Sequence, residues 1–364
     1  MGLTQKREIT QSDVLSALGG VLDPELNKDL VTLNMIKDIR VEGGKVSFKL
    51  VLTTHACPLK KELEDAARRA VEKIPGVAGV NVEVTASVPQ SRKLPEKEPI
   101  HGVKNTIAVA SGKGGVGKST VSVNLAVALA MKGSKVGILD IDIYGPSIPM
   151  MMGIHKPLDI TEDKRLIPVE NYGVKLISVG FMLDEETPLI WRGPLVMQLV
   201  QQFLKGVQWG GLDYLVIDLP PGTGDAQLTL VQTIPLTGAV IVTTPQDVAL
   251  IDARRAIKMF GEVNVPILGI VENMSEFVCP HCGKTTEIFS HGGGEKTSQR
   301  YCVPFLGSIP IDPRIREGGD SGKPIVAASM DSPQSQAFLK LAEKVASTIS
   351  VLDLAESAPP SGRP

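Results

Sequence analysis

The sequence predicts a doubly wound, mainly parallel α/β sheet that is preceded by a small α+β domain. Three observations lead to this prediction. From about residue 104 onward, short β-branched apolar runs alternate with segments of helical spacing, which is typical of a parallel sheet covered by helices. A glycine-rich loop, residues 111–120 (SGKGGVGKST), joins the first of these strands to the first of these helices. Before residue 90 the order is helix, two strands, helix and strand, which favours a separate small domain.

The predicted small domain covers residues 1–90. Ser12 or Asp13 is expected to cap its first helix, which runs to about Val21 before Asp23-Pro24-Glu25 ends it. A Glu-Gly-Gly turn at residues 42–44 favours a hairpin between the first two strands. The other elements are strands at 36–41, 45–53 and 80–87 and a helix at 60–73.

Cys57 lies between a predicted strand and the next helix of this domain. A helix N-terminus at that position would lower the pKa of the thiol and make its thiolate usable as a ligand or a nucleophile. A buried and inert cysteine is the alternative. The segment after the domain, residues 87–103, contains three prolines and no periodicity, and we predict that residues 91–103 are a linker.

The glycine-rich loop fits the phosphate-loop pattern G-x-x-x-x-G-K-[ST], with Gly112, Gly117, Lys118 and Ser119 at the fixed positions. A short apolar strand at 106–110 enters the loop and a helix leaves it. Inward-turned N–H groups and the helix N-terminus would bind the phosphates of ATP. We expect Lys118 to reach the β- and γ-phosphates and the Ser119 hydroxyl to bind Mg²⁺. The residues expected around the phosphates are Gly112, Gly114, Gly115, Val116, Gly117, Lys118, Ser119 and Thr120.

Aspartates follow two of the later strands, where open α/β sheets place their ligands. We expect Asp142 to position or activate the attacking water and Asp140 to support the Mg²⁺ shell. Asp218 ends another apolar run and would hold Mg²⁺ through water, while Gly222 would sense the γ-phosphate. The predicted reaction is hydrolysis of ATP to ADP and phosphate, with no covalent intermediate.

The remaining elements continue the alternation through a predicted unit that spans residues 104–352. Residues 353–364 are expected to form a disordered tail. The predicted elements are a helix at 121–131, a strand at 135–140, a hairpin of strands at 165–169 and 174–179, a helix from Trp191-Arg192-Gly193 to about residue 204, strands at 213–218 and 239–244, a helix to about residue 260, strands at 267–273 and 305–309, and a helix at 335–350.

Two cysteines form a C-x-x-C-G sequence, Cys279-Pro280-His281-Cys282-Gly283, which would let two thiolates bind one metal. A tetrahedral zinc or a [4Fe–4S] cluster takes four ligands, so two protomers that share one site would complete the set. The residues alone leave iron and zinc open, and a redox dithiol is disfavoured because no helix is predicted after the pair. We expect His281 to be exposed and Cys302 to be a core thiol.

The motifs of the larger unit carry a family resemblance. The sequence K-G-G-x-G-K-S resembles the deviant phosphate loop of the MinD/ArsA/nitrogenase iron-protein ATPases. In that group the extra lysine, here Lys113, reaches across a dimer interface, which implies a homodimer that closes on ATP. Residues 140–147 (DIDIYGPS), 218–225 (DLPPGTGD) and 279–283 (CPHCG) resemble the Mrp/ApbC family of iron–sulfur carriers. The resemblance implies that Asn273 reads the adenine edge and that Pro310 borders the base.

The first domain resembles the small iron–sulfur assembly domain of the MIP-eighteen family, through residues 23–25 (DPE), 41–44 (VEGG) and 53–58 (TTHACP). Together, these resemblances imply an ATPase that holds a labile [4Fe–4S] cluster on Cys279 and Cys282 between two protomers. Such a carrier would receive the cluster from scaffold proteins, hydrolyse ATP slowly and pass the cluster to apo-proteins.

Two other functions remain open at this point. The first is a MinD-type positioning ATPase, which the Pro/Ser-rich end of the sequence disfavours because MinD-like proteins end in a basic amphipathic membrane helix. The second is a zinc-bridged nucleotide-binding scaffold.

The composition excludes several classes of partner. The formal net charge is −2 and aromatic residues make up 4% of the 364 residues, so we expect no nucleic-acid partner. No apolar run reaches the length of a membrane-spanning helix, so we expect no membrane partner. Two of the four cysteines form the C-x-x-C pair, which is typical of metal or redox chemistry in the cytosol. We therefore predict a cytoplasmic protein.

Overall fold

The computed structural model describes residues 9–90, 97–182, 193–279 and 281–357. The chain divides into two compact units, one of residues 1–89 with 346–364 and the other of residues 90–345. Each unit has its own cluster of buried apolar side chains. We refer to them as the small unit and the sheet unit.

The small unit contains a three-stranded sheet in the order β3-β4-β5, with β3 and β4 antiparallel and β4 and β5 parallel. Alternate residues of β4, among them Phe48 and Leu50, pack with Leu18 of α1 and Leu63 of α2 in the core. The predicted order of helix, two strands, helix and strand is therefore correct, with one short ladder added. The bounds are α1 Gln11–Leu18, β1 Leu22–Asp23, β2 Lys28–Asp29, β3 Ile36–Glu42, β4 Lys45–Leu52, α2 Lys60–Glu72 and β5 Gly79–Ala86.

The first helix begins and ends earlier than predicted. Thr10 is its N-cap: the Thr10 hydroxyl accepts from the Asp13 N–H at 3.2 Å, and the Asp13 carboxylate accepts from the Thr10 N–H at 2.9 Å. This reciprocal pair is a capping box, so Ser12 is not the cap and Asp13 takes part from the third helical position. The helix ends at Leu18 because two glycines follow.

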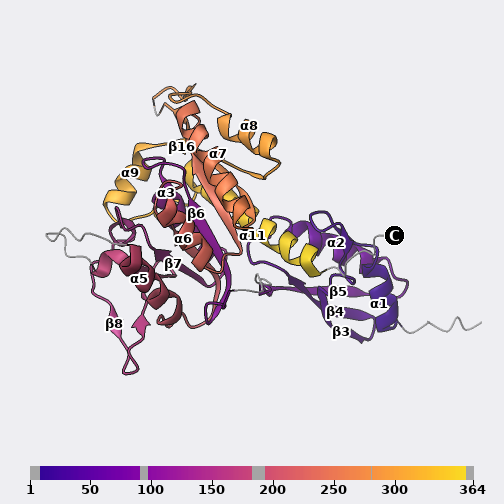
Figure 1. The fold of residues 1–364 in the computed structure, drawn as a ribbon. Coiled ribbons are helices and arrows are strands. Elements are labelled where there is room, and N and C mark those ends of the chain that lie inside the picture. The colour runs from indigo at the N-terminus through magenta and orange to yellow at the C-terminus, as the bar shows by residue number, and fades with distance from the viewer. Residues whose placement is uncertain (1–8, 91–96, 183–192, 280, 358–364) are drawn as a thin grey trace, which may run out of the picture. The chain divides into compact units, whose positions relative to one another are not determined.

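The sheet unit is built on a mainly parallel sheet, as predicted (Figure 1). Within the described residues nine strands take the order β10-β11-β7-β12-β6-β13-β14-β15, with β16 beside β14. Only the outer pairs β10–β11 and β14–β15 are antiparallel. The strands are β6 Val103–Ala110, β7 Val136–Asp140, β10 Val169–Asn171, β11 Val174–Ser178, β12 Leu212–Asp218, β13 Gly238–Thr243, β14 Ile267–Val278, β15 Thr285–Thr286 and β16 Phe305–Ile311.

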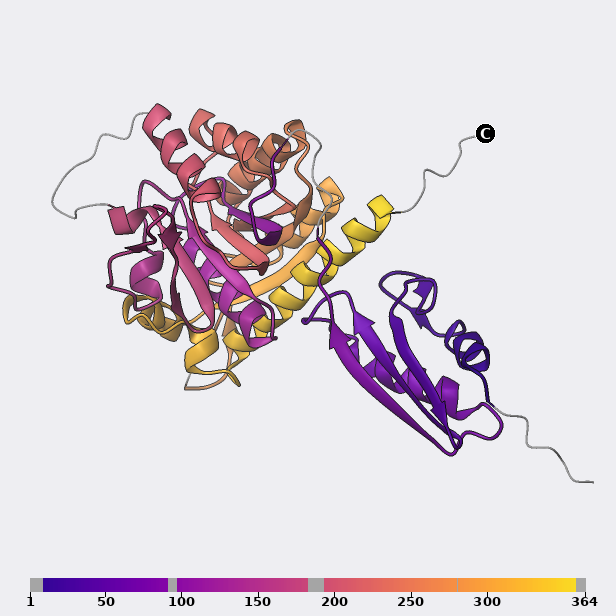
Figure 2. The same ribbon diagram turned by 90° about the horizontal axis from the view of Figure 1, so that it is seen from below.

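Helices cover both faces of this sheet (Figure 2). On one face, Phe203 of α5 and Phe260 of α7 join a buried cluster with Ile217 and Ile241 of the strands. Helix α3 packs against β6, β7 and β12 and is buried along most of its length. The helices are α3 Lys118–Met131, α4 Ile148–Met151, α5 Gly193–Lys205, α6 Asp225–Thr233, α7 Asp247–Glu262, α8 Gly293–Tyr301, α9 Pro313–Asp320, α10 Ile325–Ala328 and α11 Pro333–Ser357.

Three predicted elements have different bounds in the structure. The hairpin around residues 171–173 is present, but its first strand is Val169–Asn171, because Leu166–Ile167 (β9) pairs with Asp159–Ile160 (β8). Helix α5 begins at Gly193, and the predicted start at Trp191 and Arg192 lies outside the described residues.

The final helix, α11, runs to Ser357, so the predicted disordered tail begins too early. The reason is that Leu352 and Leu354 are half-buried and continue the apolar pattern of Val345 and Ile349. Residues 358–364 lie outside the described part.

Part of the predicted linker is fixed to the sheet unit. The Lys97 ammonium donates to the carbonyl oxygens of Val231 and Ile234 at 3.0 and 3.2 Å, near the C-terminus of α6. Burial lowers the pKa of Lys97. Ile100 is buried, and β6 then begins at Val103. The linker therefore has fewer residues without contacts to the sheet unit than the sequence indicates.

The core of the sheet unit gives a test of the packing. Phe203→Ala should lower the free energy of unfolding by about 3–5 kcal/mol, because the ring is 0% exposed and its removal leaves a cavity. Leu195→Ala on the same helix is the control. The Leu195 side chain is 54% exposed, so its loss should cost less than about 1 kcal/mol. Thermal unfolding of the full chain measures both, and equal effects would contradict the packing described.

Candidate nucleotide site and thiol pair

The register of the parallel strands brings the candidate nucleotide residues to one edge of the sheet. Strand β12 pairs with β7 and β6 so that Asp218 lies opposite both Asp140 and Val109. Strand β11 places Ser178 opposite Asp140. The loop that follows β6 therefore leaves the same edge at which the two aspartates end their strands, as open α/β sheets require of a ligand site.

The glycine-rich loop lies between β6 and α3 and lines a cavity of about 220 Å³. Gly117 is the N-cap of α3 and has a φ of +83°, a value that favours glycine. A Cβ atom on Gly112 would lie 2.2 Å from the backbone carbon of Asp252, so only glycine fits there. The loop residues expected around the phosphates line this cavity: Gly114, Gly115, Gly117, Lys118, Ser119 and Thr120. Gly112 and Val116 support the loop from outside the cavity lining.

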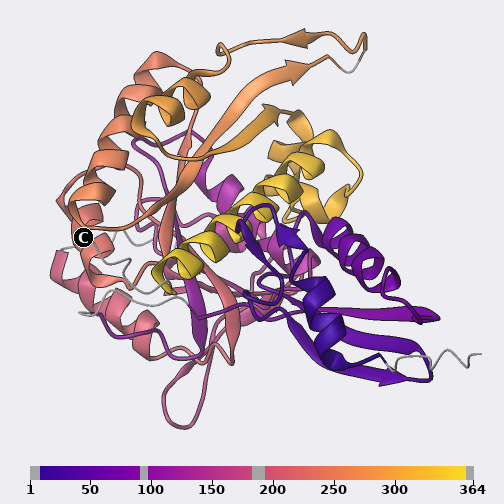
Figure 3. The same cartoon turned by 90° about the vertical axis from the view of Figure 1, so that its right-hand side faces the viewer.

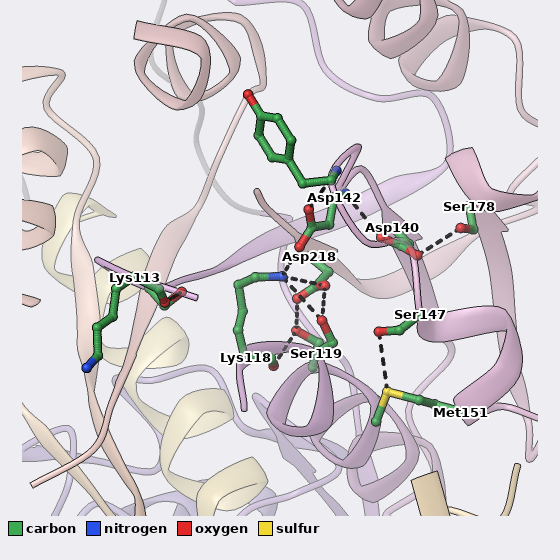
Figure 4. A network of polar contacts seen from close by, with 12 residues as sticks. Lys113, Lys118, Ser119, Asp140, Asp142, Ser147, Met151, Ser178 and Asp218 are labelled. Atoms are coloured by element: carbon green, nitrogen blue, oxygen red, sulfur yellow. Dashed lines mark hydrogen bonds and ion pairs between the residues drawn. The ribbon is translucent and has the colours of Figure 1, made fainter. Parts of the chain in front are cut away.

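Lys118 lies among the aspartates and is 6% exposed (Figure 4). Its Nζ is 2.6 Å from Asp218 Oδ2 and 3.2 Å from Asp142 Oδ2. Burial lowers the pKa of Lys118, but the carboxylates of Asp218 and Asp142 outweigh it and hold the pKa above its ordinary value. The side chain is therefore charged at neutral pH.

Asp140 is completely buried, as is Asp218. Burial first, and then the Asp218 carboxylate, raise the pKa of Asp140 from 3.8 to about 8, while hydrogen bonds from Ser178 and from the Asp142 N–H act in the opposite direction. The Ser178 hydroxyl donates to Asp140 Oδ2 at 2.8 Å and accepts from the Gly180 N–H at 2.9 Å. The hydrogen bonds from Ser178 and from the Asp142 N–H thus fix the position of the Asp140 carboxyl.

Two hydroxyls lie on the Asp218 carboxylate. Ser119 Oγ donates to Oδ2 at 2.7 Å and Ser122 Oγ donates to Oδ1 at 2.6 Å. A hydroxyl and a carboxylate side by side suit Mg²⁺, which prefers oxygen ligands and takes the rest of its shell from water and phosphate. The residues present therefore fit the predicted ion.

A second cavity, of about 410 Å³, adjoins the phosphate cavity. Thr120, Ser147 and Met151 line both, so one elongated ligand can occupy the two together. The lining of the second cavity is mainly apolar, which suits a flat base, and Asp312, Arg316 and Asp320 also border it. Asn273 and Pro310, both predicted at the base, lie on its wall beside Met150, Met274, Ile311 and Ile315.

Asn273 does not end its strand as predicted, because β14 continues to Val278. Its amide nitrogen donates to the carbonyl oxygen of Val116 at 2.9 Å. A Cβ atom on Gly117 would lie 2.2 Å from that nitrogen. Asn273 therefore contacts the backbone of the glycine-rich loop as well as the base cavity.

Two further residues of the site adjoin this edge. Gly222 has a φ of +106° and its N–H donates to the Ser111 carbonyl oxygen at 2.9 Å, which ties the loop after β12 to the start of the glycine-rich loop. Lys113 is partly exposed, and its side chain points away from Lys118 (Figure 4).

The cysteine pair lies at the tip of a hairpin made by β14 and β15, which projects from the sheet (Figure 3). The Cys279 N–H donates to the Lys284 carbonyl oxygen at 3.0 Å, and the Gly283 N–H donates to the Cys279 carbonyl oxygen at 2.9 Å. Backbone N–H groups of His281 and Cys282, and then the Cys282 thiol, lower the pKa of Cys279. The two thiols therefore lie together and favour a thiolate.

Among the described residues, no group of three or more His, Cys, Asp or Glu side chains is arranged to hold a metal ion. His281 and Cys282 are exposed, as predicted for the histidine. Cys302 is also exposed, so its prediction as a core thiol is wrong. It follows the last turn of α8 with a φ of +51°, which turns the chain outward at the helix end. Cys57 is half-buried at the edge of the core of the small unit, three residues before α2.

Comparison with known proteins assigns the family. Residues 102–346 match the family described as NUBPL iron-transfer P-loop NTPase, and residues 11–84 match the iron–sulfur cluster assembly protein family. The chain belongs to the NUBPL iron-transfer P-loop NTPases. It is 50% identical over 351 residues, 95% of this chain and 99% of the relative, to an iron–sulfur cluster carrier protein of Synechocystis sp..

Two other comparisons agree with the assignment. An iron–sulfur protein required for NADH dehydrogenase in Arabidopsis thaliana mitochondria is 55% identical over 247 residues, 68% of this chain and 79% of the relative. A nucleotide-binding protein of Archaeoglobus fulgidus, solved with ADP, aligns with a TM-score of 0.58 and 40% identity over 67% of this chain and 97% of that one. In the described part of this NTPase, no helix has both the length and the apolarity to cross a bilayer.

Two hydroxyls of this P-loop NTPase site are not among the residues predicted from the sequence. Ser122 lies one helical turn after Lys118, so the spacing from the loop could have placed it on the same side of α3. Ser178 ends β11, but its contact with Asp140 depends on the order of strands in the sheet, which no local pattern reveals.

Lys118→Ala should weaken the affinity of the NTPase for MgATP at least about 100-fold, or about 2.7 kcal/mol, because the cation that pairs with Asp218 and Asp142 and lines the phosphate cavity is lost. Lys113→Ala, on the same loop, is the control and should bind nucleotide within about 2-fold of wild type when the chain is dilute. Titration with a fluorescent nucleotide measures both. Unchanged affinity in Lys118→Ala would contradict the site.

The pKa of Asp140 predicts a dependence of stability on pH. Between about pH 4 and pH 8 the folded carboxyl keeps a proton that the unfolded one loses, so the free energy of unfolding should fall as the pH rises through this window. Asp140→Asn should remove this part of the decline, whereas Asp331→Asn, at an exposed position, should keep the wild-type profile. Chemical denaturation at a series of pH values tests it. Parallel profiles for wild type and Asp140→Asn would contradict the assignment.

Proposed function

We propose that this chain is an ATP-hydrolysing carrier that holds a [4Fe–4S] cluster between two copies of itself and passes it to apo-proteins. The main support for this proposal is the pair of thiols at the tip of an exposed hairpin, in a chain whose relatives are named iron–sulfur cluster carriers. The cluster is the cargo. Its release requires ligands near the surface, and Cys279 and Cys282 meet that condition.

The number of ligands supports a shared site. A [4Fe–4S] cluster takes four thiolates, and the hairpin supplies two. The described residues offer no further ligand beside them. A second copy related by a two-fold axis would supply the same pair, so the set becomes complete without a new element. The lowered pKa of Cys279 supports the thiolate state that iron requires.

The nucleotide site would drive the exchange. Lys118 and the N-terminus of α3 would bind the phosphates, while Asn273 and Pro310 would border the base, since they line the two adjoining cavities. Bound Mg²⁺ would neutralise charge that develops on the transferred phosphoryl group, and Ser119 with Asp218 would hold it, supported by Asp140.

Asp142, 3.2 Å from the lysine, would position the water that attacks the γ-phosphate, and Gly222 would sense that phosphate. The Lys113 side chain points away from Lys118 of its own copy, which supports a role at the nucleotide of a partner copy. Dimer closure on ATP would then bring the two thiol pairs together.

The proposed partners follow from this role. Scaffold proteins would donate the cluster and apo iron–sulfur proteins would receive it, in the cytoplasm, where thiols stay reduced. Cys57, in the unit that matches iron–sulfur assembly proteins, is a candidate accessory thiol in that exchange. Relatives that match 92–95% of the chain are named iron–sulfur cluster carriers, which favours this role over a positioning ATPase.

Anaerobic reconstitution with iron and sulfide tests the cluster. Wild type should gain about two iron and two sulfide per protomer and become a dimer, which is the content of one shared four-iron cluster. Cys279→Ser/Cys282→Ser should gain neither and stay colourless. Cys302→Ser, at the other exposed thiol of the sheet unit, is the control and should load like wild type.

Other results would redirect the proposal. Full iron loading of the double variant would move the cluster away from the hairpin. About half a zinc per protomer with no iron would favour the zinc-bridged scaffold, because four thiolates suit zinc as well. Unchanged cluster retention and transfer in Lys118→Ala would separate the cluster from the ATPase.

A further inference from the structure

A second polar network lies on β14, between the base cavity and the thiol pair. Ser275 Oγ is fully buried and donates to Glu272 Oε1 at 2.6 Å. The same hydroxyl oxygen is 2.7 Å from His291 Nδ1, and that nitrogen is 3.6 Å from Glu272 Oε1. None of the three residues belongs to the sites described above.

Glu272 ties this network to the start of α8. It is 0% exposed, and it accepts from the N–H groups of Gly292 at 3.0 Å and Gly294 at 2.6 Å. A buried carboxylate needs such donors, and the N-terminus of a helix supplies them together with a favourable dipole. Glu272 therefore fixes β14 to the segment by which the chain returns from the thiol hairpin.

Strand β14 changes its course within the network. Asn273 lies opposite Ile309 and Phe277 lies opposite Ile311, so four steps along β14 correspond to two along β16. Met274 has a φ of +55°, which is uncommon for a residue with a side chain. Such a bulge redirects a strand, and here it directs β14 out of the sheet toward the cysteines.

The hairpin beyond the bulge has little support of its own. Its ladder consists of two residue pairs, Phe277 with Thr286 and Val278 with Thr285. The network closes the base of the hairpin, because Ser275 lies on the outgoing side and His291 on the returning side. The network therefore fixes the base of the hairpin on which the thiols lie.

The outgoing side also touches the nucleotide loop. Asn273, next to Glu272, donates to the Val116 carbonyl oxygen, and Met274 lines the base cavity. A nucleotide that displaces either side chain would act on the residues that flank Ser275. The contact runs without interruption from the glycine-rich loop to the base of the hairpin.

We propose that Glu272, Ser275 and His291 are positioning residues that transmit nucleotide occupancy at Asn273 to the thiol pair. This inference rests on the proposed function only in taking Cys279 and Cys282 as the cluster ligands. The network holds the hairpin in one arrangement, and the bulge at Met274 lets nucleotide binding select another.

The test uses the full, reduced, metal-free chain and follows alkylation of Cys279 and Cys282 by iodoacetamide, with and without saturating MgADP or a non-hydrolysable MgATP analogue. Peptide mass spectrometry separates these thiols from Cys57 and Cys302. In wild type, nucleotide should change the alkylation rate about 5-fold or more, the lower end of usual coupling between sites. In Ser275→Ala the ratio should fall toward one, with the nucleotide affinity within about 2-fold of wild type.

Matched variants separate positioning from folding. Ser275→Ala leaves Glu272 with both backbone donors, so the fold should survive. His291→Leu should lose the nucleotide effect, and His291→Asn should restore it, because its amide can replace Nδ1. Thr286→Ala, exposed on β15 outside the network, should behave as wild type.

A wild-type ratio of one would overturn the inference, and so would a full nucleotide effect in Ser275→Ala. Because the readout needs no cluster, it stays separate from the reconstitution. If the chain binds no iron but nucleotide still changes the alkylation of the thiols, the proposed cargo is wrong and the proposed transmission remains valid.

Discussion

The Lys118 ammonium is the one cation among three buried or nearly buried carboxylates in the described part of the site, and the rest of the site depends on this contact. An ammonium that is 6% exposed requires close partners, which Asp218 and Asp142 supply. One charge cannot offset three, so Asp140 keeps its proton near neutral pH. Incoming phosphates would add further negative charge, and a divalent cation beside Asp218 would offset it. This charge balance supports the proposal that the site takes a metal–nucleotide complex.

This contact depends in turn on the sheet. Asp140 and Asp218 end two parallel strands in register, and the loop with Lys118 follows the strand beside them. A shift of one residue in either strand would turn its aspartate to the opposite face and remove it from the lysine. The apolar side chains that fix this register, such as Ile217 and Ile138, are completely buried. Packing of the core thus determines the electrostatics of the site.

Local patterns in the sequence were enough to predict the sheet, the glycine-rich loop and the aspartates, because each of these is encoded within about ten residues. Contacts between distant segments were not predictable in this way. Ser178 reaches Asp140 through strand order, and His291 reaches Ser275, which lies sixteen positions earlier in the chain, across the hairpin. The prediction of Cys302 as a core thiol is wrong because its exposure follows from the backbone at the end of α8 and not from its own apolar character. Local sequence therefore determines the order of the motifs along the chain, whereas the contacts between their side chains depend on the tertiary fold.

Strand β14 shows why such connections matter. Asn273 and Cys279 are six residues apart, at most about 20 Å along an extended strand. A regular strand over that distance would transmit little of a movement at Asn273 to Cys279, because its hydrogen bonds to the neighbouring strand would hold every residue equally. The bulge at Met274 interrupts the pairing of β14 with β16, which resumes at Phe277. The network of Glu272, Ser275 and His291 supplies an additional anchor at this interruption. A thiol pair on a hairpin that is anchored at its base can change position when that anchor shifts. A labile cluster on this hairpin would therefore be sensitive to the nucleotide through the sheet unit alone.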